Sequence, residues 1–596
     1  MRKVVDLNGL WHFLPELEPQ YHELPVYADP SWDRRNWQVV RVPGCWNLYG
    51  PQYALYEGVA WYARTFSLES WGEGDVGVLR FGGVNYEAQV FVNGTGVGEH
   101  CGGYSEFTVD VSSALRSGEN VVAVRVDNRR HRILLPACLG WYNYGGIQRS
   151  VQLELSRGAR IDWAGIAAAP EGAGAALKLR VEYSPSPVQP ARLRLQIQDP
   201  GGEEALCDEF EVGPGSAQTS AELRLARAVR WSPAQPAIYR ASLRLLDRSG
   251  EELDSLELEF GERAVAARGC ELTLNGEPIF LKGICYLPDH PLVGFSYDPL
   301  VAARDLDHLQ ELGVNALRSH VPLHPQFLSQ CDRRGLLVIG EPPIYCLSPR
   351  ENEGSAFSDG RYIALARQMI CEMIRAGYNH PSIIMWSLGN ECAASHPEAL
   401  GFFRQLAAAA RSLDSSRPLA YASLYGEIGE LAQLVDVIGI NEYWGWYDRI
   451  SPLGDKDEQL ARAVTAGADG SRYISVETLS LARLEEELAA KRKEYGKPLL
   501  LTEFGADAVP GYRSLDLALW SEDYQALLIE KTIELAARSE GVCGTFPFCY
   551  QDYPDPSKHV NARWAGLNLK GIVTYSRTPK LAAAALERCY HKPAAQ

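Results

Sequence analysis

NHPSIIMWSLGNECA, residues 379–393, is the stretch that decides the fold. Its middle is almost continuously apolar, and the polar residues Asn390 and Glu391 follow directly, with no polar face of a helix or strand to which they could belong. A strand of a parallel barrel is buried on both faces and therefore shows such an apolar run. Its carboxyl end opens onto the face of the barrel where polar functional residues gather. The stretch predicts a barrel strand that places Glu391 at the barrel mouth.

The sequence on both sides repeats this pattern, with amphipathic helices between the strands. Helical stretches are expected at 300–313, 362–378 and 481–496. The predicted strands are 279–284, 313–320, 336–341, 382–391, 419–424, 435–443, 498–505 and 542–552. Eight strands that alternate with helices predict a (β/α)8 barrel, which we assign to residues 264–596.

Two regions of short strands precede the predicted barrel. Residues 1–157 alternate apolar and polar side chains, with turn residues between the runs, and this predicts a packed β-sandwich. Asn93-Gly94 predicts a tight hairpin turn within it, although the same residues begin a glycosylation sequon. Residues 158–263 hold strand-like runs about ten residues apart, a spacing typical of an immunoglobulin-like sandwich.

Composition and charge limit the kinds of partner. At 596 residues the chain is too long for one hydrophobic core, which favours several domains. A net charge of −17 argues against nucleic acid and anionic membranes, and no apolar run approaches the length of a membrane span. Thirteen cysteines without a CxxC pair, and no apolar segment typical of a signal peptide, lead us to expect a cytoplasmic protein. Dense aromatics in the first sandwich lead us to expect a homo-oligomer.

One pair of histidines has a spacing that metal sites use. His320 and His324 are four residues apart, which on a helix would suit a metal ion. Pro322 between them disfavours a regular helix. We therefore expect neither a metal nor any other cofactor.

A second acid ends another predicted strand. Glu503 follows the apolar run in LLLTEFG, residues 499–505, just as Glu391 follows the apolar run of its own strand. The two acids are 503 − 391 = 112 residues apart. Two carboxyl groups that face each other across a cleft, one ionised and one protonated, are the groups that cleave glycosidic bonds. The alternative is that each glutamate belongs to a buried salt bridge. Matching positions at two strand ends favour catalysis, because an unpaired acid is costly to place there without a function.

These motifs, with LRSH at 317–320 and INEYWGWY at 440–447, resemble glycoside hydrolase family 2 over nearly the whole chain. The resemblance implies that the N-terminal sandwich is a jelly roll of the sugar-binding kind. It also implies a retaining mechanism, with Glu391 as acid/base and Glu503 as nucleophile, their carboxyl groups about 5 Å apart.

The resemblance further implies roles for five neighbours of this pair. Asn390 resembles the residue that hydrogen-bonds the sugar 2-hydroxyl. Tyr443 resembles the tyrosine that hydrogen-bonds the nucleophile, and Asn441 lies beside it in the motif. Arg318 matches the arginine that keeps the nucleophile ionised, and His320 matches a histidine of the sugar subsite.

The sugar is indicated by Asn568 and Lys570 in GLNLKGIVT, residues 566–574. They resemble the Asn-x-Lys element with which the β-glucuronidases of this family hold the C6 carboxylate of the substrate. A lysine ammonium would supply the local positive charge that an acidic protein needs for an anionic sugar. The resemblance therefore implies an exo-acting enzyme for terminal β-D-glucuronides. The alternative is that Lys570 is a solvated loop residue.

Three positions depart from the β-glucuronidase pattern. Gly140 stands where an aspartate is usual, Leu287 where a histidine is usual, and Phe548 where a tryptophan is usual. The aspartate and the histidine contact the 3- and 4-hydroxyl side of the sugar in the family. The resemblance therefore does not extend to recognition on that side of the sugar.

The departures keep other functions open. Asp289, His290 or Asp552 could take over the contact with the sugar hydroxyls. A β-galacturonidase or β-galactosidase of the same family is one alternative, and a carbohydrate-binding protein on an inactive hydrolase scaffold is another. The polar loop 346–360 follows the third predicted strand, so it could shape access for the aglycone or be a plain surface connection.

Overall fold

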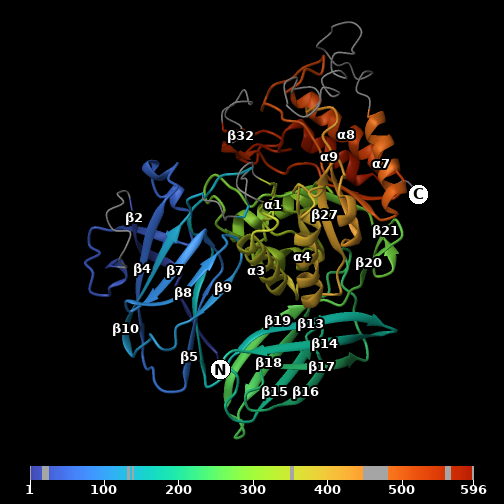
Figure 1. The fold of residues 1–596 in the computed structure, drawn as a ribbon. Helices are drawn as coiled ribbons and strands as arrows, with labels where there is room; N and C mark the ends of the chain where they lie inside the picture. Colours follow the sequence, from blue (N-terminus) through green and yellow to red (C-terminus); the bar gives the residue numbers. More distant parts are fainter. Residues whose placement is uncertain are drawn as a thin grey trace.

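The computed structural model describes residues 2–16, 26–130, 135–136, 140–349, 355–447, 481–556 and 566–592. These residues form two β-sandwiches and a closed barrel, with the first sandwich beside the barrel and the second beneath it (Figure 1). The predicted fold class, two sandwiches followed by a (β/α)8 barrel, is confirmed. In this described part of the chain, no helix combines the length and the apolar character that crossing a bilayer requires.

The first sandwich packs a sheet of four strands against a sheet of six. The predicted turn at Asn93-Gly94 is confirmed: it joins two paired strands, and both residues have positive φ, 51° and 86°. One sheet has the order β1 (Lys3–Asp6), β12 (Val151–Arg157), β5 (Asp75–Phe81) and β9 (Phe107–Asp110). The other has the order β3 (Gln38–Val42), β2 (Gly9–Pro15), β4 (Val59–Leu68), β10 (Gly118–Asp127), β7 (Glu87–Val92) and β8 (Thr95–Cys101).

The second sandwich is smaller and consists of two antiparallel sheets. The first sheet has the order β13 (Ile161–Glu171), β14 (Gly174–Tyr183) and β17 (Gln218–Leu225). The second has the order β16 (Glu204–Val212), β15 (Ala191–Gln198), β18 (Tyr239–Leu246) and β19 (Glu252–Phe260). Alternate residues of β15 and β18 are buried between the sheets, as the period of two requires.

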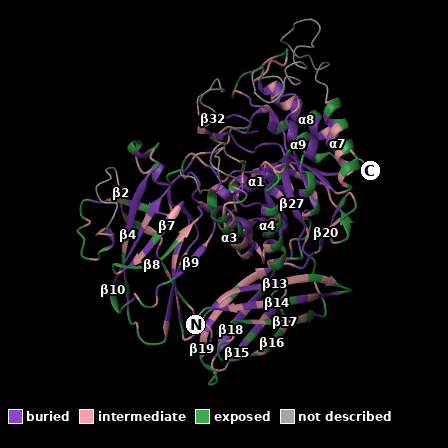
Figure 2. Ribbon diagram, in the orientation of Figure 1, coloured by how far each residue is buried: buried purple, intermediate pink, exposed green. Residues whose placement is uncertain are grey.

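The barrel closes with its strands in chain order. They are β23 (Leu281–Cys285), β24 (Ala316–Arg318), β25 (Leu337–Gly340), β26 (Ile383–Asn390), β27 (Leu419–Leu424), β28 (Val437–Asn441), β29 (Leu499–Glu503) and β30 (Val542–Thr545). The helices are α1 (Pro299–Glu311), α2 (Pro325–Arg334), α3 (Gly360–Gly377), α4 (Ala399–Leu413), α7 (Ala482–Tyr495), α8 (Glu522–Arg538) and α9 (Leu581–His591). Figure 2 shows the barrel interior buried and the outer helix faces exposed.

The predicted strands are present, but several end earlier than predicted. β27 coincides with the predicted range 419–424. β24 covers three residues of the predicted range 313–320, and β30 covers only Val542–Thr545 of the range 542–552. The residues that follow the last strand-to-strand hydrogen bond lie in the loops of the barrel mouth. Those loops are also apolar and aromatic, so composition does not show where the strand ends.

Side chains of the first sandwich reach the mouth of the barrel. Arg149 Nη2 donates a hydrogen bond to the carbonyl of Pro322 at 2.6 Å. Trp141 lies nearly parallel to His320, with ring centroids 6.0 Å apart and an interplanar angle of 11°. Two domains, rather than the barrel alone, therefore border the face where the predicted site lies.

A cluster of buried charges joins the two sandwiches. Glu154 accepts hydrogen bonds from Arg80 Nε at 2.7 Å and Arg160 Nη2 at 2.6 Å. Arg2 bridges the domains, because its Nη1 donates to Glu154 at 3.3 Å and its Nε donates to Asp254 at 3.0 Å. Burial favours a higher pKa for Glu154, but the three arginines outweigh it and lower the pKa to about 2.

Replacing this carboxylate tests the cluster. Glu154→Gln leaves buried arginines without their counter-charge, so we expect a loss of about 3–5 kcal/mol of stability at neutral pH. The folded-state pKa lies below the usual 4.5, so this stabilisation is present above pH 4.5 and is lost as the pH falls toward 2. Urea melts of the variant and the parent protein at pH 7 and pH 3 measure the difference.

The matched control is Glu209→Gln, because Glu209 pairs with Arg194 on the surface. That change should leave the urea midpoint nearly unaltered at both pH values. A loss from Glu154→Gln that is the same at pH 3 as at pH 7 would contradict the assignment of the cluster.

Candidate active site

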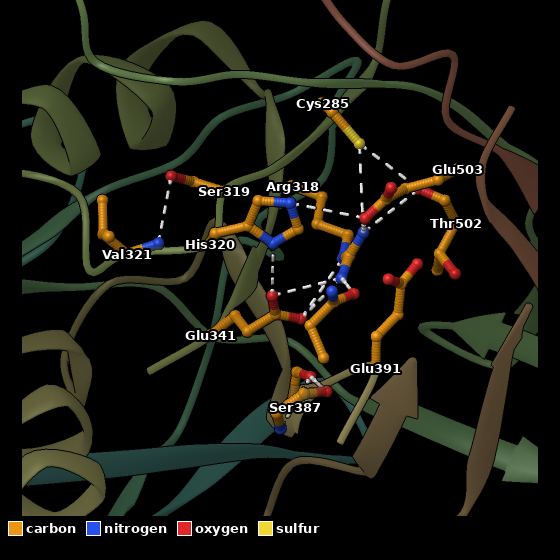
Figure 3. A network of polar contacts seen from close by, with 12 residues as sticks. Cys285, Arg318, Ser319, His320, Val321, Glu341, Ser387, Glu391, Thr502 and Glu503 are labelled. Carbon is orange, nitrogen blue, oxygen red and sulfur yellow. Dashed lines mark hydrogen bonds and ion pairs between the residues drawn. The ribbon is translucent and has the colours of Figure 1, made fainter. Parts of the chain in front are cut away.

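The two predicted acids end strands four and seven of the barrel. Glu391 follows β26 directly, and Glu503 is the last residue of β29. Both side chains turn their carboxyl groups into the same space (Figure 3). Parallel strands bring their carboxyl ends to one face of the barrel, so acids 112 residues apart in sequence (503 − 391) meet there.

Glu503 is bound through both of its carboxylate oxygens. Arg318 Nη1 donates to Oε1 at 2.9 Å, and His320 Nε2 lies 3.3 Å from the same oxygen. The Tyr443 hydroxyl donates to Oε2 at 2.8 Å. The contacts that the sequence predicts for Arg318 and Tyr443 with this acid are therefore present, and His320 approaches the acid as well.

Glu391 lies in a different environment. Asn441 Nδ2 donates to its Oε1 at 2.7 Å, and the Cys346 thiol lies 3.9 Å from its Oε2. Burial, followed by the negative charge of Glu503, raises the pKa of Glu391 to about 7. This acid can therefore hold a proton at neutral pH and release it within the same pH range.

Asn390 presents one amide donor to the site. Its Oδ1 accepts hydrogen bonds from Arg318 Nη2 at 2.7 Å and from Asn441 Nδ2 at 3.0 Å. These bonds fix the orientation of the amide, and its buried Nδ2 has no partner among the described residues. A substrate hydroxyl could accept from this nitrogen.

Glu341 belongs to the site but was not among the predicted residues. Arg318 Nη2 donates to its Oε2 at 3.0 Å, and His320 Nδ1 lies 2.9 Å from its Oε1 (Figure 3). Burial favours a higher pKa for Glu341, but Arg318 and His320 outweigh it and lower the pKa. The signal was available, because the predicted strand 336–341 ends in this acid just as two other strands do.

Lys570 and Asn568 lie together beside Tyr443. Lys570 is 1 % exposed, and its Nζ donates to Asp507 Oδ2 at 2.8 Å and lies 5.6 Å from the centre of the Tyr443 ring. The alternative of a solvated loop lysine is therefore wrong. Asn568 accepts from the Lys570 backbone N–H at 3.1 Å and donates to the Tyr553 hydroxyl at 3.0 Å. Burial favours a lower pKa for Lys570, but Asp507 outweighs it and raises the pKa, so the ammonium keeps its charge.

The three residues that could replace the usual contacts to the sugar hydroxyls bind other groups of the protein. Asp552 is buried and accepts a hydrogen bond from Lys580 at 2.7 Å. Asp289 is buried and accepts hydrogen bonds from Tyr144 and Tyr575. The ring of His290 accepts from the backbone N–H of the nearby residue 292.

The remaining predicted positions are explained by packing. His324 accepts from the Gln326 backbone N–H at the start of α2, so the two histidines of the sequence pair point to different partners. Leu287 and Phe548 are buried. The loop 346–360 is described at both ends, with Cys346 near Glu391, but its residues 350–354 lie outside the described part.

Three family models match the chain in succession. They are the sugar binding domain of glycosyl hydrolases family 2 at residues 4–156, a second family 2 model at 160–263, and the family's TIM barrel domain at 265–594. A β-glucuronidase of Paenibacillus borealis is 29% identical over 98% of this chain and 96% of its own length. A β-glucuronidase of Homo sapiens is 27% identical over 99% of this chain and 91% of its own length.

Solved structures are similar over the same extent. A β-D-glucuronidase of Dictyoglomus thermophilum has a TM-score of 0.84 and 25% identity, and the match covers 100% of this chain and 98% of the other. A β-galacturonidase of Eisenbergiella tayi, bound to galacturonate, has a TM-score of 0.82 and 27% identity, with 99% and 97% coverage.

The charge of Glu503 can be removed to test its effect on Glu391. Glu503→Gln keeps the shape of the side chain but deletes the negative charge, so we expect the pKa of Glu391 to fall from about 7. Carboxyl-carbon NMR of protein labelled at glutamate follows the titration, and Glu391→Gln identifies the resonance. An unchanged titration in the Glu503→Gln protein would show that the two carboxyl groups do not interact.

Proposed function

The chain belongs to glycosyl hydrolase family 2, and from this premise we propose that it is a retaining exo-β-glycosidase that hydrolyses terminal β-D-glucuronides. The observation that carries the proposal is the unequal environment of two neighbouring acids. Glu503 is held by a guanidinium and a tyrosine hydroxyl, whereas the pKa of Glu391 is raised to about 7. A double displacement requires one attacking carboxylate and one carboxylic acid.

In the first step, Glu503 attacks the anomeric carbon as the bond to the leaving oxygen breaks, and Glu391 donates its proton to that oxygen. In the second step, Glu391 takes a proton from water, which attacks the anomeric carbon and releases Glu503. The free Nδ2 of Asn390 would bind the sugar 2-hydroxyl throughout. A pKa near neutrality suits Glu391 to both proton transfers.

The preference for a uronide is supported by Lys570. Its buried ammonium lies close to the ring of Tyr443, and the hydroxyl of Tyr443 is bonded to Glu503. The positive charge is therefore near Glu503, on the side where Tyr443 lies. Asp507 and Tyr447 are hydrogen-bond partners of the ammonium, and the third of its three donors remains for a carboxylate. Charge-assisted hydrogen bonds of this kind are about twice as strong as neutral ones. The β-glucuronidases that resemble this chain support the same assignment.

A β-galacturonidase is the second candidate, with β-galactosidase the neutral-sugar alternative. It is favoured by the similar structure from Eisenbergiella tayi and by Gly140 and Leu287, which leave the 3- and 4-hydroxyl side without the usual residues. Phe548, which replaces the usual tryptophan, is a third departure from the β-glucuronidase pattern. Glucuronides and galacturonides share the C6 carboxylate, so Lys570 would serve either.

Other sequence-based expectations remain our proposals. We place the domain boundaries at 157/158 and 263/264 and expect a jelly-roll topology in the first sandwich. We also propose a cytoplasmic homo-oligomer, with no cofactor needed for hydrolysis.

A panel of nitrophenyl β-glucuronide, β-galacturonide and β-galactoside tests the proposal. We expect kcat/KM to be highest for the glucuronide. Lys570→Met should lower kcat/KM for either uronide by about 10- to 150-fold, the range for a hydrogen bond to a charged group, and should change the galactoside value far less. Lys580→Met, which also unpairs a buried aspartate, is the matched control and should affect all three substrates alike.

The outcomes separate the candidates. A preference for the galacturonide would favour the second candidate. If Lys570→Met leaves uronide turnover intact, Lys570 does not bind the substrate carboxylate. A protein that binds these sugars but cleaves none would be the carbohydrate-binding alternative.

A further inference from the structure

Three aromatic rings pack around His320 and a fourth packs against one of them; together they form what we call the aromatic wall: Trp141, Tyr345, Phe548 and Tyr553. The ring centroids of Trp141, Tyr345 and Phe548 lie 6.0, 5.0 and 5.8 Å from that of His320. Tyr553 packs edge-on against Phe548 at 6.2 Å. Because His320 approaches Glu503, the wall borders the space where the sugar would bind.

Tyr345 is the ring of this wall with surface to offer a ligand. The other three rings are each at most 7 % exposed, whereas Tyr345 is half-buried in the described part of the chain. Its hydroxyl points to the first sandwich, where a β-carbon on Gly140 would lie only 3.1 Å away. A glycine at 140 therefore makes room for the hydroxyl of Tyr345.

The position of Tyr345 between two parts of the site is fixed on both sides. On one side its backbone pairs with Asn390, whose N–H donates to the Ile344 carbonyl at 2.9 Å. On the other side Tyr345 is one of the neighbours of Tyr553, whose hydroxyl pKa is raised first by burial and then by the nearby ionisable groups. Tyr553 in turn accepts a hydrogen bond from Asn568.

The geometry of a pyranose ring indicates which sugar hydroxyls Tyr345 would contact. With the 2-hydroxyl at Asn390 and the C6 carboxylate at Asn568 and Lys570, carbons 3 and 4 must lie between those two ends of the sugar. Tyr345 neighbours both ends, because its backbone pairs with Asn390 and its ring belongs to the same wall as Tyr553, the partner of Asn568. We infer that Tyr345 binds the hydroxyls at C3 and C4 and determines the preference between glucuronides and galacturonides, which differ only in configuration at C4. The inference rests on the proposed function, because the carboxylate orients the sugar.

The test is the ratio of kcat/KM for nitrophenyl β-glucuronide and β-galacturonide in four proteins: the parent, Tyr345→Phe, Gly140→Ala and the double variant. Loss of one neutral hydrogen bond should lower kcat/KM for the preferred uronide about 3- to 10-fold. The other epimer should lose less, so the ratio should shift at least about threefold. A ratio is insensitive to partial loss of folded protein.

The double variant separates a contact from a general disturbance. The added methyl of Gly140→Ala crowds the hydroxyl oxygen at 3.1 Å but lies at an ordinary 3.7 Å from the ring carbon. Gly140→Ala should therefore shift the ratio in the parent and have no effect in the Tyr345→Phe background. Tyr183→Phe, which removes a hydroxyl bonded to Thr219 in the second sandwich, should leave the ratio unchanged.

The proposed function and the inference fail in different ways. If the parent cleaves a uronide but Tyr345→Phe leaves the ratio unaltered, the inference is wrong and the proposed function stands. If the two changes add in the double variant, the predicted contact is absent. If the parent cleaves neither uronide, the proposed function fails, and the inference fails with it.

Discussion

The geometry of the site depends on one buried guanidinium. Arg318, at the end of β24, donates hydrogen bonds to Glu503, Glu341 and Asn390. One cation therefore holds Glu503, Glu341 and the Asn390 amide in place, and removing a member of such a buried pair costs about 3–5 kcal/mol. Glu391 is bound by an amide instead, and burial together with the charge of Glu503 raises its pKa to about 7. The two acids differ because the cation binds one of them.

The barrel and the first sandwich share the task of building this site. Barrel strands bring acids from distant parts of the chain to one face, as parallel strands with helical crossovers require. The sandwich adds Trp141, which lies against His320, and Gly140, which leaves space for the Tyr345 hydroxyl. The barrel therefore positions the two acids, while one wall of the candidate site depends on the contact between the two domains.

The sequence predicts which acids lie at the ends of barrel strands, but it does not predict which loop side chains are buried. Glu391 and Glu503 could be found because each follows an apolar run, and Glu341 follows the same rule at a strand that was predicted. The burial of Lys570 against Asp507 could not be found, because a loop lysine looks the same in sequence whether it is solvated or buried. The position of Tyr345 likewise depends on packing between residues far apart in the chain.

The most direct measurement is to trap the sugar on the enzyme. A 2-deoxy-2-fluoro-β-glycosyl fluoride of the preferred uronide has a good leaving group but an electron-poor anomeric centre, so the covalent intermediate should accumulate. Peptide mass spectrometry then locates the attached sugar. A single adduct on Glu503 is the predicted result. An adduct on Glu391, or steady turnover with no adduct at any carboxylate, would contradict Glu503 as the attacking group.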